Sequence, residues 1–288
     1  MKKFKIEKEY QRMKISQYLR EVQNYSGRSL RNVEVFLNGK RVRTTKKLPS
    51  SGILKVEEKK KGTDIKPINL NLEIVYEDED ILVVNKEPFL LTHPTQKKAE
   101  YTLANGIVYY FIEKYGEEKV PRFYNRLDMN TSGLIIIAKN SFSQAFLQNY
   151  SQFEKKYLAI VDGIVEEDGE IIIEKPIYKD GENLQRIIDE RGQYAKTAVK
   201  VIRRFPEKNV TLIECELFTG RTHQIRVHLK SIGHTITGDE LYGGSLDKER
   251  GVTRQFLHAY KVKFTHPSKN EEIELEIPIS EDMAEFLE

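Results

Sequence analysis

The stretch 124–140, YNRLDMNTSGLIIIAKN, contains the residues best suited to chemistry, Arg126 and Asp128, in a polar loop before an aliphatic run. The turn-forming residues 130–133 can hydrogen-bond the local backbone and so fix the carboxylate. The aliphatic run predicts a buried strand that anchors the loop. A rigid carboxylate on such a loop can act as a nucleophile or a general base. The alternative is a structural ion pair that closes a turn.

A second motif, LFTGRTHQIRVHLKSIGH, begins at Leu217 and carries two arginines, Arg221 and Arg226. Thr222 is predicted to cap a helix that ends at Gly233. Cations are poorly placed at a helix N-terminus, because the helix dipole favours acids there. The two arginines therefore predict a partner outside the helix, either a phosphate or the carboxylate of Asp128.

The same motif contains His223 and His228, which are five residues apart and would not share a helix face. Their spacing does not favour a metal site, so both are interpreted as core or surface histidines. The single cysteine, Cys215, excludes an internal disulfide framework and a thiolate metal cluster within one chain.

Tyr157 follows two lysines at the start of the predicted strand KKYLAIVDG. It is either an ordinary strand aromatic or a residue that faces a cleft. In a cleft its ring could stack on a base, and its hydroxyl could take part in proton transfer.

The whole chain has 288 residues, of which 39% are hydrophobic and 32% are charged. This composition predicts a hydrophilic globular protein with one large or two smaller domains. No apolar run approaches the length of a membrane span, and the start lacks the apolar segment of a secretory signal. Together with the cysteine content, these features predict a cytoplasmic protein.

Charge is unevenly distributed along the chain. Residues 1–63 hold 18 lysines and arginines against 6 aspartates and glutamates, whereas residues 64–288 hold 29 against 38. Such asymmetry is typical of a nucleic-acid-binding appendage on a separate body. The alternative is a solvated surface with no partner.

The basic segment predicts two helices and a hairpin. Apolar spacing indicates a helix over 14–23 that ends before Gly27, and Ser29 is predicted to cap a second helix through Val33. Asn38-Gly39 indicates a tight turn, with 53–56 as the returning strand. The cations predicted to contact a nucleic acid here are Arg28, Arg31, Lys40, Arg41 and Arg43, beside Lys46 and Lys47.

A charged segment without apolar periodicity, 64–71, is predicted to link residues 1–63 to a second domain, 72–288. Many consecutive strand patterns with few helices follow it. They predict an α+β fold, with a largely antiparallel mixed sheet and flanking helices.

Two resemblances add to these expectations. The two helices and FLNGKRVR resemble the small RNA-binding module of the ribosomal-protein-S-four type. The motifs VVNKEPFLLTHP, RLDMNTSGLIIIAK, KKYLAIVDG, GRTHQIRVHL, GHTITGDELYG and FLHA, over about residues 70 to 280, resemble the RluA-type RNA pseudouridine synthases in order and spacing. The basic module is a common attachment in that family.

The second resemblance implies isomerisation of a flipped-out uridine in RNA, without a cofactor or a metal. Asp128 matches the catalytic aspartate, and Tyr157 matches a tyrosine that stacks on the target base and is a candidate proton-transfer group. Arg226 matches the basic partner of the aspartate. Arg126 matches an arginine that helps to hold the place of the flipped nucleotide, and Arg221 is a further candidate RNA contact.

One position departs from the family pattern, because Asn125 stands where a histidine usually precedes Arg-Leu-Asp. Asparagine keeps a donor and an acceptor but cannot titrate. It leaves open an RNA-binding or ribosome-assembly protein without catalysis on the same fold. A glycoside hydrolase is a third interpretation, but it would require a second acid near Asp128.

Among RNA substrates, the basic module favours large-subunit ribosomal RNA over transfer RNA. We expect a monomer and no membrane partner.

Overall fold

The computed structural model describes residues 2–59, 62–94 and 101–288. The side chain of Arg28, one of the predicted RNA contacts, lies outside the described part. None of the helices in these ranges is long and apolar enough to cross a membrane.

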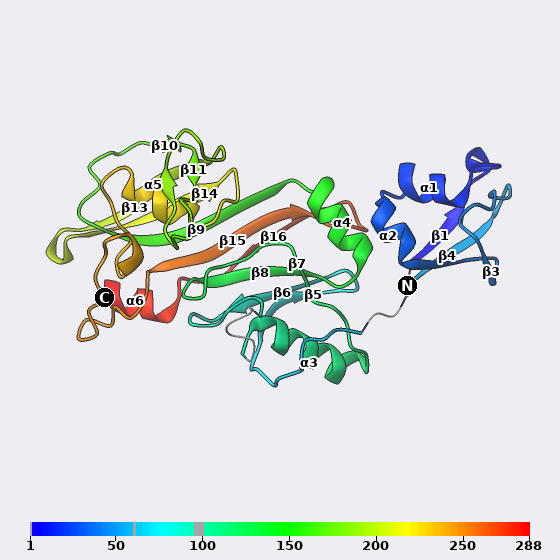
Figure 1. Cartoon of the computed structure of the whole chain (residues 1–288), viewed down its shortest axis with the longest axis horizontal. Coiled ribbons are helices and arrows are strands. Elements are labelled where there is room, and N and C mark those ends of the chain that lie inside the picture. Colours follow the sequence, from blue (N-terminus) through cyan, green and yellow to red (C-terminus); the bar gives the residue numbers. More distant parts are fainter. Residues whose placement is uncertain (1, 60–61, 95–100) are drawn as a thin grey trace.

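Within residues 2–59, a four-stranded antiparallel sheet and short helices form the basic region at one end of the elongated molecule (Figure 1). The sheet order is β1-β4-β2-β3. Buried Ile15, Tyr18 and Leu19 pack a helix onto this sheet. The elements are β1 (Lys2–Ile6), η1 (Lys8–Tyr10), α1 (Ile15–Glu21), α2 (Gly27–Arg31), β2 (Val33–Leu37), β3 (Lys40–Val42) and β4 (Gly52–Glu58).

The structure corrects two details of this region. The predicted cap Ser29 is wrong, because Ser26 accepts the backbone N–H of Ser29 at 3.0 Å and α2 therefore starts at Gly27. The turn at Asn38-Gly39 is confirmed, but the strand that returns from it is β3. The segment 53–56 belongs to β4, which pairs with the opposite edge of β2.

The second domain contains a ten-stranded mixed sheet in its described residues, in the order β10-β13-β14-β9-β15-β8-β6-β5 with β16 on β15 and β7 on β8. Its strands are β5 (Glu73–Glu77), β6 (Ile81–Lys86), β7 (Arg122–Phe123), β8 (Ser132–Ala138), β9 (Phe153–Asp162), β10 (Ile171–Glu174), β13 (Lys196–Phe205), β14 (Val210–Leu217), β15 (Leu257–Thr265) and β16 (Glu272–Glu276). The ribbon of β11 (Ile177–Tyr178) and β12 (Ile187–Ile188) is separate.

The helices of this domain are α3 (Leu103–Tyr115), α4 (Ser141–Asn149), α5 (Gln224–Lys230) and α6 (Glu281–Leu287), with short 3-10 turns η2 (Pro206–Lys208) and η3 (Glu240–Tyr242). The predicted α+β class, with a largely antiparallel mixed sheet and flanking helices, is confirmed.

The strand β8 is buried along its whole length, because the sheet is covered on both faces there. Ile135 and Ile137 pack with the α3 cluster, whereas Leu134 and Ile136 pack on the other face with Leu147 of α4. Burial on both faces explains the continuous aliphatic run.

A parallel pairing of β8 with β15 interrupts the otherwise antiparallel sheet. Gly133 has φ of +115°, and a Cβ built on it would lie 2.3 Å from the carbonyl oxygen of Ala259. Only glycine fits this close approach of two backbones. The joint fixes the start of β8, directly after the loop that carries Asp128.

The N-terminal sheet is docked on the second domain. The ring centroids of Tyr25 and Phe142 lie 4.7 Å apart, and Lys2 Nζ lies 2.7 Å from Asp80 Oδ2. The 64–71 boundary between two functional units stays a prediction.

Candidate active site

The loop between β7 and β8 carries Asp128, and hydrogen bonds to its backbone carbonyls hold it in place. The Thr131 N–H donates to the Asp128 carbonyl at 3.1 Å, and the Thr92 hydroxyl donates to the Leu127 carbonyl at 3.1 Å. Lys86, which is 1% exposed, donates to the Met129 carbonyl at 3.1 Å. The carboxylate of Asp128 itself is one-third exposed, so a fixed loop presents an accessible charge.

Asn125 anchors the same loop to β8. Its Nδ2 donates to the Leu134 carbonyl at 3.0 Å, and its Oδ1 accepts the Ile136 N–H at 2.9 Å. The Asn125 amide therefore satisfies one backbone acceptor and one backbone donor of β8. Because the amide is uncharged, this anchor does not require the burial of a charged group.

Arg226, on α5, divides its guanidinium between two carboxylates. Its Nη1 lies 3.0 Å from Asp128 Oδ2, while Nε and Nη2 each lie 2.7 Å from the oxygens of Asp239. Asp239 is 1% exposed. Burial lowers the pKa of Arg226, but hydrogen bonds and charge from Asp239, with a smaller part from Asp128, outweigh it and raise that pKa overall. Arg226 therefore stays charged beside Asp128.

His223 is a site residue that the sequence interpretation missed. It occupies the left-handed region with φ of +58° and lies at the N-cap of α5, so the predicted cap Thr222 is wrong. The predicted role of Gly233 is confirmed: α5 ends at Lys230, and the left-handed Gly233 closes its last turn, with its N–H on the Lys230 carbonyl and that of His234 on the Leu229 carbonyl. The Nε2 atom of His223 lies 3.6 Å from Asp128 Oδ2 and its Nδ1 2.9 Å from Tyr242 Oη. Burial, partly offset by the Asp128 charge, lowers the pKa of His223, so the ring is neutral at neutral pH.

The two ring nitrogens of His223 face different partners. The Tyr242 hydroxyl accepts the backbone N–H of Arg186 at 2.8 Å and still has its own hydrogen to donate to His223 Nδ1. The Asp128 carboxylate, which can only accept, lies on the Nε2 side and favours a hydrogen there. A neutral imidazole that accepts at Nδ1 carries its hydrogen on Nε2. That hydrogen is on the side of Asp128.

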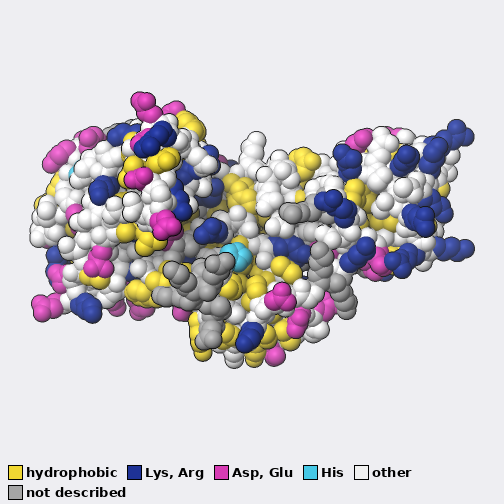
Figure 2. All heavy atoms as spheres, in the orientation of Figure 1, with side chains coloured by type: hydrophobic (Ala, Val, Ile, Leu, Met, Phe, Trp, Pro, Cys, Tyr) yellow, Lys and Arg dark blue, Asp and Glu magenta, His cyan; other side chains and the backbone are white. Residues whose placement is uncertain are grey.

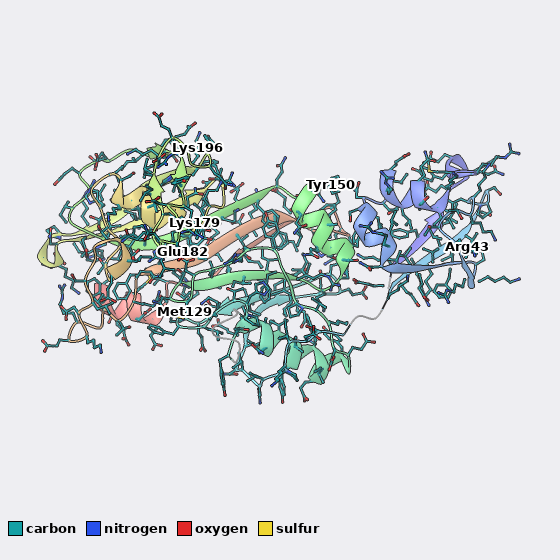
Figure 3. The ribbon with its side chains drawn as sticks, in the orientation of Figure 1. Arg43, Met129, Tyr150, Lys179, Glu182 and Lys196 are labelled. Atoms are coloured by element: carbon teal, nitrogen blue, oxygen red, sulfur yellow. The ribbon has the colours of Figure 1, made fainter. Side chains whose placement is uncertain are left out.

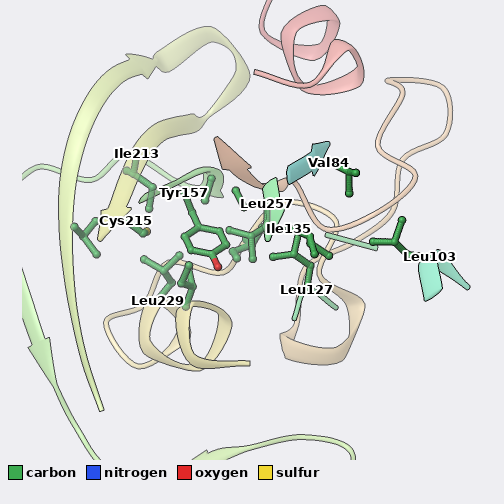
Figure 4. Close-up of a cluster of buried hydrophobic side chains, with 14 of the residues drawn as sticks. Val84, Leu103, Leu127, Ile135, Tyr157, Ile213, Cys215, Leu229 and Leu257 are labelled. Carbon is green, nitrogen blue, oxygen red and sulfur yellow. The ribbon is translucent and has the colours of Figure 1, made fainter. Parts of the chain in front are cut away.

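Tyr157, on β9, is 7% exposed and belongs to the main hydrophobic cluster. Figure 4 shows its hydroxyl directed between Leu229 and Leu127. Burial raises the pKa of Tyr157, and the nearby charge of Asp128 raises it further, so the phenol is protonated. Its hydroxyl makes no hydrogen bond to another described residue.

Two clefts meet at Asp128. The larger has a volume of about 790 Å³ and extends past segment 91–94 and η3. The smaller has a volume of about 390 Å³ and is lined by Tyr157 and Arg221. The residues that line both are Arg126, Leu127, Asp128, His223 and Arg226. These volumes lie within the range of small-molecule sites.

The structure therefore brings five predicted site residues together: Arg126, Asp128, Tyr157, Arg221 and Arg226. Arg126 is exposed, and Arg221 is held by the Tyr194 carbonyl at 2.9 Å and Gln193 Oε1 at 3.0 Å.

The predicted N-terminal contacts do not join this group. Arg31, Lys40, Arg41 and Arg43 are exposed on the other domain, where Figure 2 shows dark blue side chains gathered and Figure 3 shows Arg43 pointing outward.

Besides His223, the sequence interpretation missed Asp239, Tyr242 and Lys86. A Gly-Asp pair after a turn and a lysine inside an apolar run were the available signals. Burial, followed by the charge of Arg254, lowers the pKa of Lys86 to about 7.

Asp239 is not the free second acid of a glycoside hydrolase, because both its oxygens bind Arg226. The fold and the site together place an arginine-held carboxylate where two clefts of a mixed-sheet protein meet, an arrangement typical of an enzyme.

The chain belongs to the RNA pseudouridylate synthase family, whose model matches residues 80–231. It is 37% identical to the Bacillus subtilis protein described as uncharacterized RNA pseudouridine synthase YlyB, over 88% of this chain and 85% of that one. It is also 37% identical to the ribosomal large subunit pseudouridine synthase D of Zymomonas mobilis, over 75% of this chain and 72% of that one.

Among solved structures, it is similar to human RNA pseudouridylate synthase domain containing 1, with a TM-score of 0.58, 27% identity and coverage of 72% and 83% of the two chains. The chain is an RNA pseudouridine synthase.

Proposed function

We propose that this enzyme converts uridine to pseudouridine in large-subunit ribosomal RNA, with Asp128 as the catalytic carboxylate. The observation that carries the proposal is the placement of Asp128 where two clefts meet, held by Arg226 at 3.0 Å. A relative named as a ribosomal large subunit synthase, and the basic N-terminal region, support this substrate.

The reaction breaks the N1–C1′ bond of a uridine and forms a C5–C1′ bond. The hydrogen on C5 is lost and N1 gains one, so no atom is added overall. Asp128 can attack C1′ as a nucleophile, or it can take a ribose proton as a base to give a glycal. Both routes need the Asp128 carboxylate fixed against the substrate, and the Arg226 guanidinium holds it at 3.0 Å.

The uridine must leave the RNA stack to reach this loop. We propose that its base enters the smaller cleft against the ring of Tyr157 and that Arg126 occupies the space it leaves. Because the Tyr157 phenol is protonated and buried, ring contact with the uracil is favoured over proton abstraction. The surrounding apolar cluster excludes water, which would otherwise attack C1′ of the ribose and release free uracil.

Residues 1–63 are proposed as an RNA-binding module of the ribosomal-protein-S-four type, and residues 72–288 as the catalytic domain. Arg31, Lys40, Arg41 and Arg43 are exposed and free to reach phosphates, although Arg41 also pairs with Glu34 at 2.6 Å. Arg221, at the smaller cleft, is a second proposed contact.

The test is carbodiimide-stop mapping of ribosomal and transfer RNA from cells that lack this gene. Each pool is incubated with wild-type protein or with Asp128→Asn. We expect stops in large-subunit ribosomal RNA with wild type only. Stops in transfer RNA alone would contradict the substrate, and stops with both proteins would contradict the role of Asp128. Tight RNA binding without stops would favour a non-catalytic RNA-binding protein.

A further inference from the structure

Phe89 is an exposed aromatic residue in a backbone conformation that aromatic residues rarely adopt. Its φ is +63° and its side chain is 55% exposed. Of the seven non-glycine residues with positive φ in the described ranges, four are asparagines, which tolerate this region. A bulky side chain in this region costs free energy and, being exposed, gains little from packing, which points to a role for the ring outside the fold.

The buried side chain of Lys86 holds the turn that carries Phe89. Lys86 Nζ donates to the carbonyls of Glu87 at 2.7 Å and Leu90 at 2.9 Å, on either side of Phe89. The third hydrogen bond of the same nitrogen reaches the Met129 carbonyl at 3.1 Å, one residue from Asp128. One lysine therefore connects the Phe89 turn to the loop of the proposed catalytic carboxylate.

The turn continues directly into the larger cleft. Leu91, Thr92 and His93 line that cleft, and the Thr92 hydroxyl is bonded to the Leu127 carbonyl. Met129, which also lines it, is 36% exposed and lies in the loop that leads into β8 (Figure 3). Two exposed apolar side chains, Phe89 and Met129, thus stand on two loops that one lysine joins.

We propose that Phe89, with Met129 on the loop that Lys86 connects to it, is a stacking platform for the base of a nucleotide next to the target uridine. This inference rests on the proposed function. When the uridine leaves the stack, its neighbours lose a stacking partner, and an exposed ring on a rigid turn can replace it. Continuity with the Asp128 cleft, and the exposed guanidinium of Arg126 on that cleft, favour a strand of RNA as the occupant.

The strained backbone allows the ring and the fold to be tested separately. Phe89→Ala and Phe89→Gly both remove the ring, but only glycine relieves the left-handed conformation. We expect Phe89→Gly to melt about 2–4 °C above Phe89→Ala, whereas both lose RNA affinity equally. The loss expected for one stacked base is about 5- to 150-fold in Kd. Phe89→Trp keeps a ring and should bind like wild type.

Binding is measured by fluorescence anisotropy with a labelled RNA hairpin that has one uridine in its loop. All variants carry Asp128→Asn, so that the result does not depend on turnover and a failure of the proposed chemistry is seen separately, in the carbodiimide assay. Each nucleotide beside the uridine is replaced in turn by an abasic ribose. One of these replacements should weaken RNA binding by the Asp128→Asn protein that keeps Phe89 and leave RNA binding by Phe89→Ala unchanged.

Wild-type affinity in both ring-deleted proteins would overturn the proposal and leave the ring free for a protein partner. Affinity lost in Phe89→Ala but kept in Phe89→Gly would also overturn it, because the effect would then follow the backbone. An abasic site that lowers RNA affinity equally in the protein with Phe89 and in Phe89→Ala would show that Phe89 contacts no flanking base.

Discussion

Asp239 accepts two hydrogen bonds of 2.7 Å from Arg226, through Nε and Nη2, and this pairing directs the remaining nitrogen, Nη1, toward Asp128. Asp239 and Arg226 together carry no net charge. The guanidinium therefore orients Asp128 while its positive charge is already balanced by Asp239. A carboxylate held in this way keeps much of its reactivity toward carbon or a proton.

Asp239→Asn should therefore lower kcat more than it raises KM. The amide keeps one acceptor but places an N–H against an N–H of Arg226, which frees the guanidinium to turn away from Asp128. A displacement of about 1 Å at a reacting group costs about 100-fold in rate. The measurement is turnover on the RNA that mapping identifies, with KM and kcat separated.

Asp282→Asn is the matched control. Asp282 binds Arg254 in the same two-pronged geometry, at 2.7 and 2.8 Å. Arg254 reaches the Asp128 loop at the Asn130 carbonyl, at 3.1 Å, but has no hydrogen bond to the Asp128 carboxylate. Both variants should lose stability, because each breaks a paired charge; for the buried Asp239 the loss is about 3 kcal/mol. Equal losses of kcat in the two variants would show that Asp239 does not act through the contact of Arg226 with the Asp128 carboxylate.

The sequence predicted the parts of this site that are local. The Asp128 loop and its strand are contiguous, so turn formers and an aliphatic run were sufficient to place them. The residue pattern alone left the partner of Arg226 between a phosphate and Asp128, because the pairing joins residues 98 positions apart, and it was the family resemblance that implied Asp128.

The missed residues depend on backbone states and on contacts distant in sequence. His223 enters the site because of its left-handed φ, which delays the helix start and displaces the expected cap, Thr222. Asp239 becomes a partner only when its loop folds against α5. The strand β1 was not predicted, because KKFKI is rich in lysine and its only strand partner in the described part is β4.

Asn125→Asp should destabilise the protein and reduce turnover. The substitution keeps the acceptor for the Ile136 N–H but replaces the donor to the Leu134 carbonyl with a second oxygen. A lost hydrogen bond with an unsatisfied partner costs about 1–3 kcal/mol. Urea unfolding measures the loss. Asn125→Ala, which removes both bonds without adding charge, should be close to it; full stability in both variants would argue against the anchoring role.

The acid sensitivity of the fold should depend on His258. This buried ring contacts Ser132 Oγ at 2.9 Å and the Pro278 carbonyl at 3.0 Å, and burial lowers its pKa to about 4. The unfolded chain takes up the proton near pH 6.5, so stability is lost as the pH falls from about 6.5 to about 4 and no further below that.

Unfolding free energies at pH 7 and pH 5 should differ by about 2 kcal/mol more in wild type than in His258→Gln. Since the other histidines are common to both proteins, the comparison isolates this one. The same pH dependence in both would place the acid-sensitive group elsewhere.

The N-terminal cations should control RNA affinity without affecting the fold. Changing Lys40, Arg41 and Arg43 to glutamine leaves the domain contact of Tyr25 with Phe142 intact, which deletion of residues 1–63 would destroy. Each lost phosphate contact reduces the slope of log K against log salt by about 0.7 to 0.9. We expect the triple variant to bind RNA more weakly and with a slope smaller by about 2 to 3, while kcat on a short hairpin stays near wild type. A control that neutralises exposed Lys179, Lys200 and Lys248 of the second domain has the same net charge. If both triple variants lose affinity equally, overall charge and not the N-terminal surface attracts the RNA.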